Sequence, residues 1–327
     1  MGSTFCATTE EPRNANRVTD IPMDRWMTRI PADLLDTPLY HLAIPGSHNA
    51  ITYALDKHRK SPVDVTQPDM LQKADKYASG LIRPVMHKWS VTQDVTVTEQ
   101  LNSGIRYCDL RIAHRPKDTS TSLYFYHGFY SKATVEMILR EIRTWLDAHP
   151  KEVVILSFSH FLDLDDKRHM RLVTTIENIF SSKLCPKMDI PTLRKLWQSG
   201  HQVIVSYDNK AMVRHHHFLW DHIPYRWANK ITAQDLIHTL ENAKQSGRPR
   251  GFFVTGINLT VDLPYITKNL TESLKGLVKS TNPTLLSWVH EQTPSSHPHS
   301  LNIVAGDFVS EGRFAQIVVS LNSKLLG

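Results

Sequence analysis

The chain has 327 residues, of which 41% are hydrophobic and 21% charged, a composition typical of a globular protein. Its formal net charge is +6, and its basic residues form no dense stripe with interleaved aromatic residues, so we expect no nucleic-acid partner. The three cysteines, Cys6, Cys108 and Cys185, are too sparse for a disulfide framework, and no apolar stretch is long enough to cross a bilayer. We therefore expect a cytoplasmic protein.

Residues 1–25 are polar and without periodicity, which predicts a flexible N-terminal tail ahead of a single domain over residues 26–327. Short apolar runs then alternate with helical patterns. The runs that predict strands are 39–48, 104–112, 123–128, 151–161, 201–209, 251–259 and 301–308. The patterns that predict helices are 134–148, 170–180, 193–198, 234–245 and 267–291, the last with a break at Pro283.

This alternation favours the α/β class and a single TIM-like (β/α) barrel, closed or nearly closed. Only seven strands are evident where such a barrel has eight. We therefore expect an irregular barrel with a short or missing unit, and we place the hidden strand between residues 263 and 300.

Four side chains stand at or just beyond the ends of predicted strands. They are His48, Arg111, His127 and Asp307. In a parallel barrel the C-terminal strand ends converge at one mouth, where function gathers. The first and last strands become neighbours on closure, so we expect Asp307 within hydrogen-bonding reach of His48.

These residue types form a coherent set for cleaving a phosphodiester. A neutral histidine can take a proton from an attacking hydroxyl, and a protonated one can give a proton to the leaving oxygen. Arg111 can bind phosphate oxygens as charge builds on them, and Asp307 can orient one imidazole.

Each of these residues also has a simpler interpretation. With 18 histidines in the chain, two can fall at strand ends by chance. Arg111 can form an ion pair with Asp109, Asp307 can cap a turn, and Asn49 can be a turn residue. His215–His217 invites a metal hypothesis, but adjacent side chains cannot converge on one ion, so a polar loop is preferred. The aromatic residues at 218–227 are either a lipid-touching rim or, as we prefer, buried under a loop.

Several motifs resemble one known family. They are IPGSHNA at 44–50, GIRYCDLRI at 104–112, FYHG at 125–128, EVVILSFSHF at 152–161 and VAGDF at 304–308. Together they are similar to the phosphatidylinositol-specific phospholipase C family of the X-domain type, over residues 35 to 320. The chain is most similar to the small eukaryotic proteins that contain the X domain alone.

The resemblance implies roles for individual residues. His48 matches the general base that takes the proton of the inositol 2-hydroxyl, and His127 matches the general acid that protonates the diacylglycerol oxygen. Asp307 matches the carboxylate that orients the base, and Arg111 aligns with an arginine of the metal-independent bacterial enzymes. Asn49, Asp109, Tyr207 and Asn258 are candidate substrate-binding residues, the last two because they end predicted strands.

The resemblance also bears on the cofactor. Calcium-dependent members use an Asn after the first His and two acidic residues in the second strand, and Arg111 stands where the second acid would be. A further acidic ligand would fall near Ser159 or His160. Ca²⁺ favours six to eight oxygen ligands, so we expect no metal and no other cofactor, with calcium disfavoured although Asn49 is retained.

The predicted function is therefore a phospholipase C that cleaves phosphatidylinositol-type lipids. We expect a monomer with transient peripheral membrane contact. Two alternatives stay open. One is a phosphoinositide-binding barrel with weak or no turnover, and the other is a glycerophosphodiester phosphodiesterase, which would need a Glu/Asp metal set that Arg111 disfavours.

Overall fold

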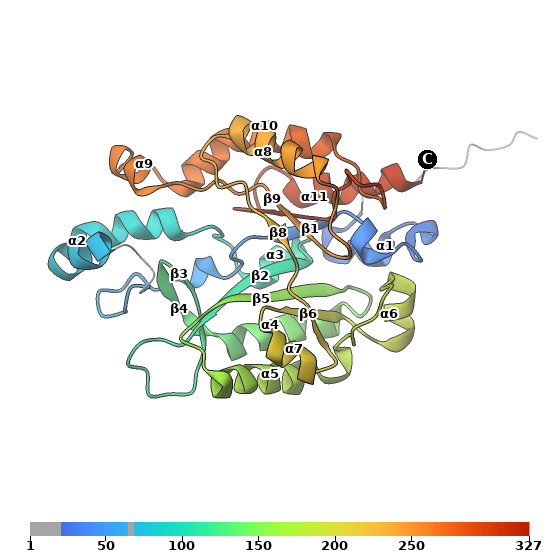
Figure 1. Cartoon of the computed structure of the whole chain (residues 1–327), viewed down its shortest axis with the longest axis horizontal. Coiled ribbons are helices and arrows are strands. Elements are labelled where there is room, and N and C mark those ends of the chain that lie inside the picture. Colours follow the sequence, from blue (N-terminus) through green and yellow to red (C-terminus); the bar gives the residue numbers. More distant parts are fainter. Residues whose placement is uncertain (1–20, 65–68, 327) are drawn as a thin grey trace, which may run out of the picture.

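Eight parallel strands form one curled sheet in the computed structural model, which describes residues 21–64 and 69–326 (Figure 1). The strands are β1 (Ile44–Ser47), β2 (Tyr107–Ala113), β5 (Val154–Leu162), β6 (Val203–Tyr207), β7 (Leu219–Trp220), β8 (Tyr225–Arg226), β9 (Val254–Gly256) and β10 (Ile303–Gly306). The predicted α/β class and TIM-like barrel are confirmed.

The first and last strands pair directly, as expected. Ser47 at the end of β1 is in register with Gly306 at the end of β10. The hydrogen-bonded order is β7-β6-β5-β2-β1-β10-β9-β8, so β7 and β8 form its two ends and leave a seam between them. The barrel is therefore open, and the seam lies away from β1 and β10, the paired first and last strands.

The hidden strand is not where we expected it. Residues 263–300 contain helices, and the additional strands are β7 and β8 at 219–226. Each is two residues long, too short to show the apolar run that identifies a strand. Only residues 221–224 join them, whereas a normal parallel crossover takes a dozen residues or more.

The third predicted strand, 123–128, also differs from its expected place. Its observed part, β3 (Tyr124–His127), pairs antiparallel with β2 and with β4 (Phe129–Thr134), so it belongs to a hairpin at the edge of the mouth. Gly128 between β3 and β4 has φ = 74°, a left-handed conformation that glycine adopts at little cost. The hairpin explains why His127 approaches the mouth from outside the ring of strands.

Eleven helices surround this sheet in the described residues. They are α1 (Trp26–Arg29), α2 (Asp69–Ser90), α3 (Val97–Asn102), α4 (Val135–Ala148), α5 (Asp166–Phe180), α6 (Leu193–Ser199), α7 (Lys210–His215), α8 (Ala233–Gln245), α9 (Leu263–Lys268), α10 (Leu274–Glu291) and α11 (Phe314–Ser320). Most begin after a side chain that accepts a backbone N–H, namely Thr96, Thr134, Asp165, Thr192, Asn209, Thr232, Asp262 and Ser273.

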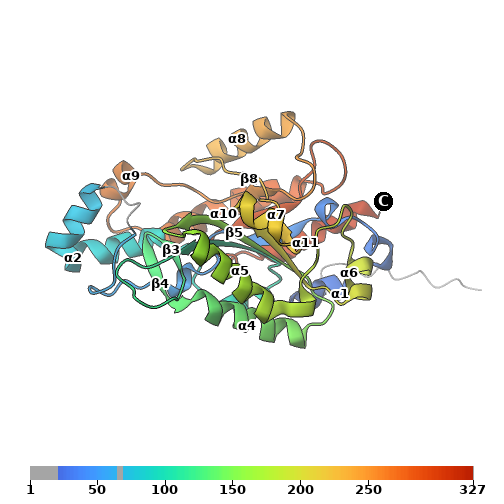
Figure 2. The same ribbon diagram turned by 60° about the horizontal axis from the view of Figure 1, so that its bottom comes forward.

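The helix predictions hold for α4, α5, α6 and α8, with small shifts at their ends. The break expected at Pro283 lies instead at residues 269–273, between α9 and α10, and Pro283 is inside α10. The sequence pattern did not indicate α2, which has a kink at Ala78 and contains Pro84. Across residues 21–64 and 69–326, no helix is long and apolar enough to cross a bilayer. Figure 2 shows α4 and α5 side by side along the sheet, with α8 on the other side of the molecule.

The alternation of residues along the strands separates two packing layers. Side chains such as Ile155, Ile204 and Ile303 fill the inside of the barrel. Neighbouring residues, such as Leu156 and Val205, pack in the layer between sheet and helices. The residue's parity in its strand therefore decides whether its side chain can reach the mouth.

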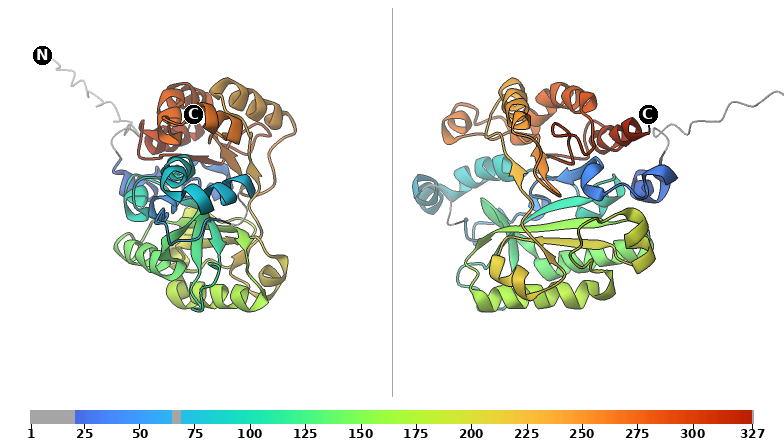
Figure 3. Two further views of the ribbon diagram at one scale, coloured as in Figure 1. Left: turned by 90° about the vertical axis from the view of Figure 1, so that its left-hand side faces the viewer. Right: turned by 45° about the vertical axis from the view of Figure 1, so that its right-hand side comes forward.

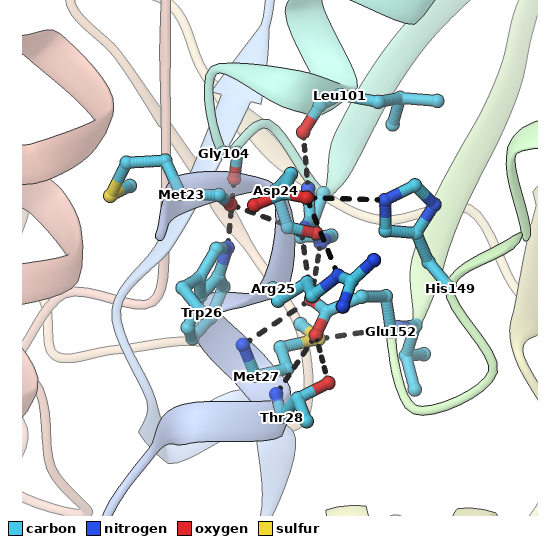
Figure 4. A network of polar contacts seen from close by, with 12 residues as sticks. Met23, Asp24, Arg25, Trp26, Met27, Thr28, Leu101, Gly104, His149 and Glu152 are labelled. Carbon is cyan, nitrogen blue, oxygen red and sulfur yellow. Dashed lines mark hydrogen bonds and ion pairs between the residues drawn. The ribbon is translucent and has the colours of Figure 1, made fainter. Parts of the chain in front are cut away.

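The predicted tail boundary at residue 25 is too late. Residues 1–20 lie outside the described residues, but Met23 and Asp24 are folded against the end of the barrel opposite the mouth. Their carbonyl oxygens accept hydrogen bonds from the guanidinium of Arg106. Figure 4 shows Met23 and Asp24 in a network of polar contacts that also includes Glu152. Arg106 in turn forms a fully buried ion pair with Glu152, with 2.7 Å between Nη2 and Oε2. A buried guanidinium needs several acceptors, and this segment supplies two of them.

Candidate active site

His48 and Asp307 are the first residues after the paired strands β1 and β10, which places them side by side at the mouth. The expected hydrogen bond is confirmed, with 2.7 Å between His48 Nδ1 and Asp307 Oδ1. Both residues are buried. Burial raises the pKa of Asp307 and the neighbouring His48 opposes that rise. Gln93, not singled out from the sequence, fixes both strand ends because its amide donates to the carbonyls of His48 and Gly306.

The other ring nitrogen of His48 faces two donors. Asn49 Nδ2 lies 3.1 Å and Arg111 Nη2 lies 3.4 Å from His48 Nε2. An amide N–H and a guanidinium N–H can only donate, so Nε2 accepts and the ring proton is on Nδ1, where Asp307 accepts it. This is the tautomer of a base: the unprotonated Nε2 is directed into the mouth, where its lone pair accepts from Asn49 and Arg111 in the free protein.

Asp109 and Arg111 lie two residues apart on β2 and therefore on the same face of the sheet. Arg111 Nε is 3.9 Å from Asp109 Oδ2, and the same oxygen accepts the backbone N–H of Asn49 at 3.2 Å. The ion pair considered from the sequence is therefore present, and it is long. The Nη2 group stays directed at His48, so the guanidinium has N–H groups available for an anion.

His127 reaches the mouth from β3. Its Nδ1 donates to the carbonyl oxygen of Ser90 at 2.7 Å, which leaves Nε2 as the nitrogen available for chemistry. The ring centroids of His127 and His48 are 6.3 Å apart. Burial, reinforced by the charge of Arg111, lowers the pKa of His127 to about 3, so its ring is neutral in this state. An anion bound beside it would raise that pKa and favour the protonated form.

Two aromatic side chains from the β8 region complete the site. The indole of Trp227 lies edge to face with His48 at 5.4 Å between centroids, and the guanidinium of Arg111 lies 5.3 Å from the indole centroid. Tyr225 packs beside His48, and its hydroxyl donates to Asn258 Oδ1 at 2.7 Å. From the sequence, Trp227 and Tyr225 were expected in an aromatic loop, because strands of two residues give no signal of where a side chain points.

The structure brings seven of the eight predicted site residues together and excludes Tyr207. Tyr207 points out of the barrel, where its hydroxyl lies 2.8 Å from His169 Nδ1 on α5 and its ring packs on Phe161. The residue does end a strand, as predicted, but it has the parity of the outward-facing Val205. We therefore remove Tyr207 from the candidate substrate-binding residues, while Asn258 stays through its contact with Tyr225.

The donor set fits a metal ion poorly. Asn49 Oδ1 and the Asp109 carboxylate are the side-chain oxygens nearest the position discussed for calcium, and the guanidinium of Arg111 lies beside them. Asn49 Oδ1 is buried and has no hydrogen-bond partner in the described residues. Ser159 and His160 bring no carboxylate. Across residues 21–64 and 69–326, no group of three or more His, Cys, Asp or Glu side chains is arranged to hold a metal.

The sequence left two interpretations for the aromatic residues at 218–227, a lipid-touching rim and burial under a loop, and different residues fit each of them. Phe218 and Leu219 are buried in the core, as preferred. Trp227 is 38% exposed and covers the site. His215–His217 end α7 and continue into the following loop, in line with a polar loop.

Comparison with known proteins decides the family. Residues 85–321, more than half of the chain, match the family model described as PI-PLC X 1. The chain belongs to the PI-PLC X domain family. The match includes the motifs at 104–112, 125–128, 152–161 and 304–308, and the resemblance drawn from the sequence is confirmed.

Within the PI-PLC X domain family, the chain is similar to PI-PLC X domain-containing protein 1 of Homo sapiens. The two are 46% identical over 314 residues, which cover 96% of this chain and 94% of the relative. Identity with PI-PLC X domain-containing protein 2 of Mus musculus is 38% over 329 residues, covering 98% and 94%. The likeness therefore extends over nearly the full length of each protein.

The fold is shared with bacterial enzymes of solved structure. The phosphatidylinositol-specific phospholipase C of S. aureus superposes with a TM-score of 0.64 at 13% identity, covering 93% of this chain and 99% of that one. The enzyme from Listeria monocytogenes gives 0.63 at 19% identity, with 92% and 99% covered. At this level of identity the comparison supports the fold alone.

Proposed function

We propose that this PI-PLC X domain protein is a phosphoric diester hydrolase that cleaves phosphatidylinositol-type lipids into diacylglycerol and an inositol phosphate. The observation that carries the proposal is the arrangement of two imidazoles. His48 has its unprotonated Nε2 directed into the mouth, the ring centroids of His48 and His127 are 6.3 Å apart, and Arg111 Nη2 lies 3.4 Å from His48 Nε2.

The first half of the reaction uses His48. Its Nε2 takes the proton of the inositol 2-hydroxyl as that oxygen attacks phosphorus, and Asp307 stabilises the resulting imidazolium through Nδ1. Arg111 donates to the phosphate oxygens, on which negative charge builds in the transition state.

The second half uses His127. Its protonated Nε2 gives a proton to the diacylglycerol oxygen as the bond from phosphorus to that oxygen breaks. The anionic phosphodiester between Arg111 and His127 supplies the charge that raises the pKa of His127 from its low value in the free protein. The immediate products are diacylglycerol and a cyclic inositol phosphate.

We infer that the reaction needs no metal and no cofactor, because Arg111 neutralises the phosphate where a calcium enzyme would use its ion. The same reasoning disfavours a glycerophosphodiester phosphodiesterase. We further infer a cytoplasmic monomer that meets the membrane peripherally.

The competing candidate is a phosphoinositide-binding barrel with little turnover. The low pKa of His127 favours it, because a proton donor that stays neutral cannot assist the leaving group. The discriminating experiment measures diacylglycerol release from phosphatidylinositol vesicles, with and without a calcium chelator. We expect release in both conditions, and loss of roughly 10²–10⁴ in rate for His48→Ala and for His127→Ala. Binding without release would favour the competing candidate, and release only with calcium would contradict metal independence.

A further inference from the structure

The carboxylate of Asp307 is held through one oxygen only. Its Oδ1 accepts from His48 Nδ1, whereas its Oδ2 is buried and has no hydrogen-bond partner among the residues that the structure describes. No second donor therefore fixes the direction of the carboxylate, and the backbone on either side of Asp307 must do so. On the N-terminal side the backbone is fixed by the sheet, because Gly306 is in register with Ser47 and its carbonyl oxygen accepts from Gln93 Nε2 at 2.9 Å.

On the C-terminal side the chain turns at once, because Phe308 has φ = 48°. This is the left-handed region, which is unfavourable for a residue with a bulky side chain and persists only where the surroundings impose it. A left-handed residue also follows each imidazole of the site. Asn49, with φ = 44°, follows His48, and Gly128 follows His127. Asn and Gly adopt this conformation readily, so the phenylalanine is the residue that needs contacts to hold it there.

The ring of Phe308 makes such contacts. It is 2% exposed and packs in a cluster whose other buried members are Trp89, Leu274 and Val278. Trp89 is near the end of α2 and the other two residues belong to α10, so the ring is held by two helices that contact each other. Figure 3 (left) shows α2 in cyan below the orange helices that include α10.

The backbone of Phe308 is tied to the segment that also holds His48. Its N–H donates to the carbonyl oxygen of Thr92 at 2.7 Å. Thr92 Oγ1 in turn lies 3.1 Å from the carbonyl oxygen of His48 and 3.2 Å from that of Asn49. Rotation about φ of residue 308 would swing this N–H and Asp307 together relative to the ring. With the ring fixed in its cluster, the left-handed angle keeps the N–H on Thr92 and Asp307 beside His48.

We propose that Phe308 is a positioning residue of the active site. Its buried ring holds residue 308 in the left-handed conformation, and this conformation directs the Asp307 carboxylate at His48 Nδ1. The inference deepens the proposed function and rests on it for the purpose of the pairing, because Asp307 orients the base of that reaction.

The test compares substitution of Phe308 by Ala and by Gly. Both remove the ring, but only Gly adopts φ = 48° without steric conflict. If the residue served only to fill the core, Gly would be no better than Ala, because it also gives the unfolded chain more conformational entropy. If the left-handed conformation matters, Phe308→Gly should exceed Phe308→Ala in melting temperature and in every measurement of the site.

Phe180 is the matched control. Its ring is fully buried in the main core at the end of α5, and its backbone is right-handed, with φ = −92°. The order of stabilities should reverse there, so that Phe180→Ala is more stable than Phe180→Gly. The same order at both positions would overturn the proposal.

The first readout of the site needs no substrate. The proton on His48 Nδ1, in a bond of 2.7 Å to a carboxylate, should give a far-downfield proton NMR signal, which Asp307→Asn assigns by its loss. We expect the signal in the unmodified protein and in both Phe180 variants, its loss or upfield shift in Phe308→Ala, and its partial return in Phe308→Gly. An unchanged signal in Phe308→Ala would overturn the proposal. If neither substitution of Phe308 folds, Phe308→Leu replaces them, and an unchanged signal in that variant would overturn it equally.

The second readout is turnover of a water-soluble inositol phosphodiester. A misdirected base should lower kcat roughly 10²-fold in Phe308→Ala with KM little changed, because the orientation of His48 acts in the transition state. Phe308→Gly should recover part of that loss. If the unmodified protein gives the downfield signal but no turnover, the proposed function fails while the positioning role stands. If it turns over and Phe308→Ala keeps the same kcat, only the positioning role fails.

Discussion

At the residue scale, the contacts of Arg111 determine what the site can do. Its guanidinium has the long pair with Asp109, the ring of Trp227 on one face and the His48 lone pair at one Nη. A planar group held in this way presents two N–H donors in a fixed direction. That geometry suits the phosphate of a diester better than a point charge would.

We predict that Arg111→Lys is severely impaired although it keeps the charge. An ammonium reaches the phosphate through a flexible stem and cannot give two parallel hydrogen bonds, so kcat should fall by roughly 10² or more. The measurement is diacylglycerol release at saturating vesicle concentration. A lysine variant with the turnover of the unmodified protein would show that the fork is irrelevant.

A second prediction concerns the stability contributed by His127. Its pKa in the folded protein is about 3, below the value of about 6.5 expected when the chain is unfolded. As the pH falls below 6.5, His127 binds a proton in the unfolded chain but not in the folded protein, so the free energy of unfolding decreases over that window. Between pH 7 and pH 5, His127→Gln should therefore lose less free energy of unfolding than the unmodified protein, by at most about 2 kcal/mol. Equal losses measured by urea unfolding at both pH values would contradict the low pKa.

The site was predictable where a residue's position follows from strand pairing. The pairing of His48 with Asp307 required only that the first and last strands be neighbours. Tyr207 was wrong because ending a strand does not determine the side on which a residue lies. Tyr225 and Trp227 were missed because the position of a two-residue strand depends on tertiary contacts that no local pattern encodes.

At the element scale, the Tyr225 side chain of β8 lies over Gly256 of β9, in the space that a side chain at position 256 would need. A Cβ on Gly256 would collide with the Tyr225 ring and with Asn258 Oδ1. This close approach lets the Tyr225 hydroxyl reach Asn258 and keeps the ring beside His48.

We predict that Gly256→Ala displaces Tyr225 and lowers both stability and turnover. Overpacking of this kind costs about 1–3 kcal/mol. Gly276→Ala is the control, because the nearest atom to its Cβ is 3.5 Å away and the residue lies in the first turn of α10. Gly256→Ala should therefore have a lower melting temperature and a lower rate of vesicle turnover than Gly276→Ala. Equal melting temperatures would mean that β8 moves to accommodate the added Cβ without loss of stability.

Most helices were predictable because an amphipathic pattern and a capping side chain coincide, as at Thr134 for α4. The long helix α2 was not, because Gly80 and Pro84 interrupt the sequence where the helix continues. Tertiary contacts such as the Arg83 pair with Asp75 offset those breaks.

At the scale of the whole molecule, one buried ion pair joins the N-terminal segment to the barrel. Glu152 accepts from Arg106 and from the backbone N–H groups of Met27 and Thr28, so it links β2 and the start of β5 to the N-terminal segment. Arg106 and Glu152 have no exposed surface. The boundary of the domain could not be read from composition, because these contacts use backbone groups that any sequence supplies.

We predict that Glu152→Gln lowers the free energy of unfolding by about 3–5 kcal/mol, since Arg106 would remain charged and buried without its partner. Glu136→Gln makes the same chemical change in an exposed pair with Arg140, where the loss should stay below about 1 kcal/mol. Urea unfolding of both variants measures the difference. A similar loss in both would show that Arg106 is stabilised by its carbonyl contacts alone.

No strand pairing joins β7 to β8, so the barrel resists deformation least at this seam. We expect movement to be greatest at β8 and Trp227, because β8 is paired on one side only, whereas β1 and β10 lie inside the ladder and fix His48 and Asp307. A headgroup that contacts both sides of the seam would hold the two edges together. Amide hydrogens at 219–226 should therefore exchange faster than those of β1 and β10 in the free protein, and should slow when inositol occupies the mouth.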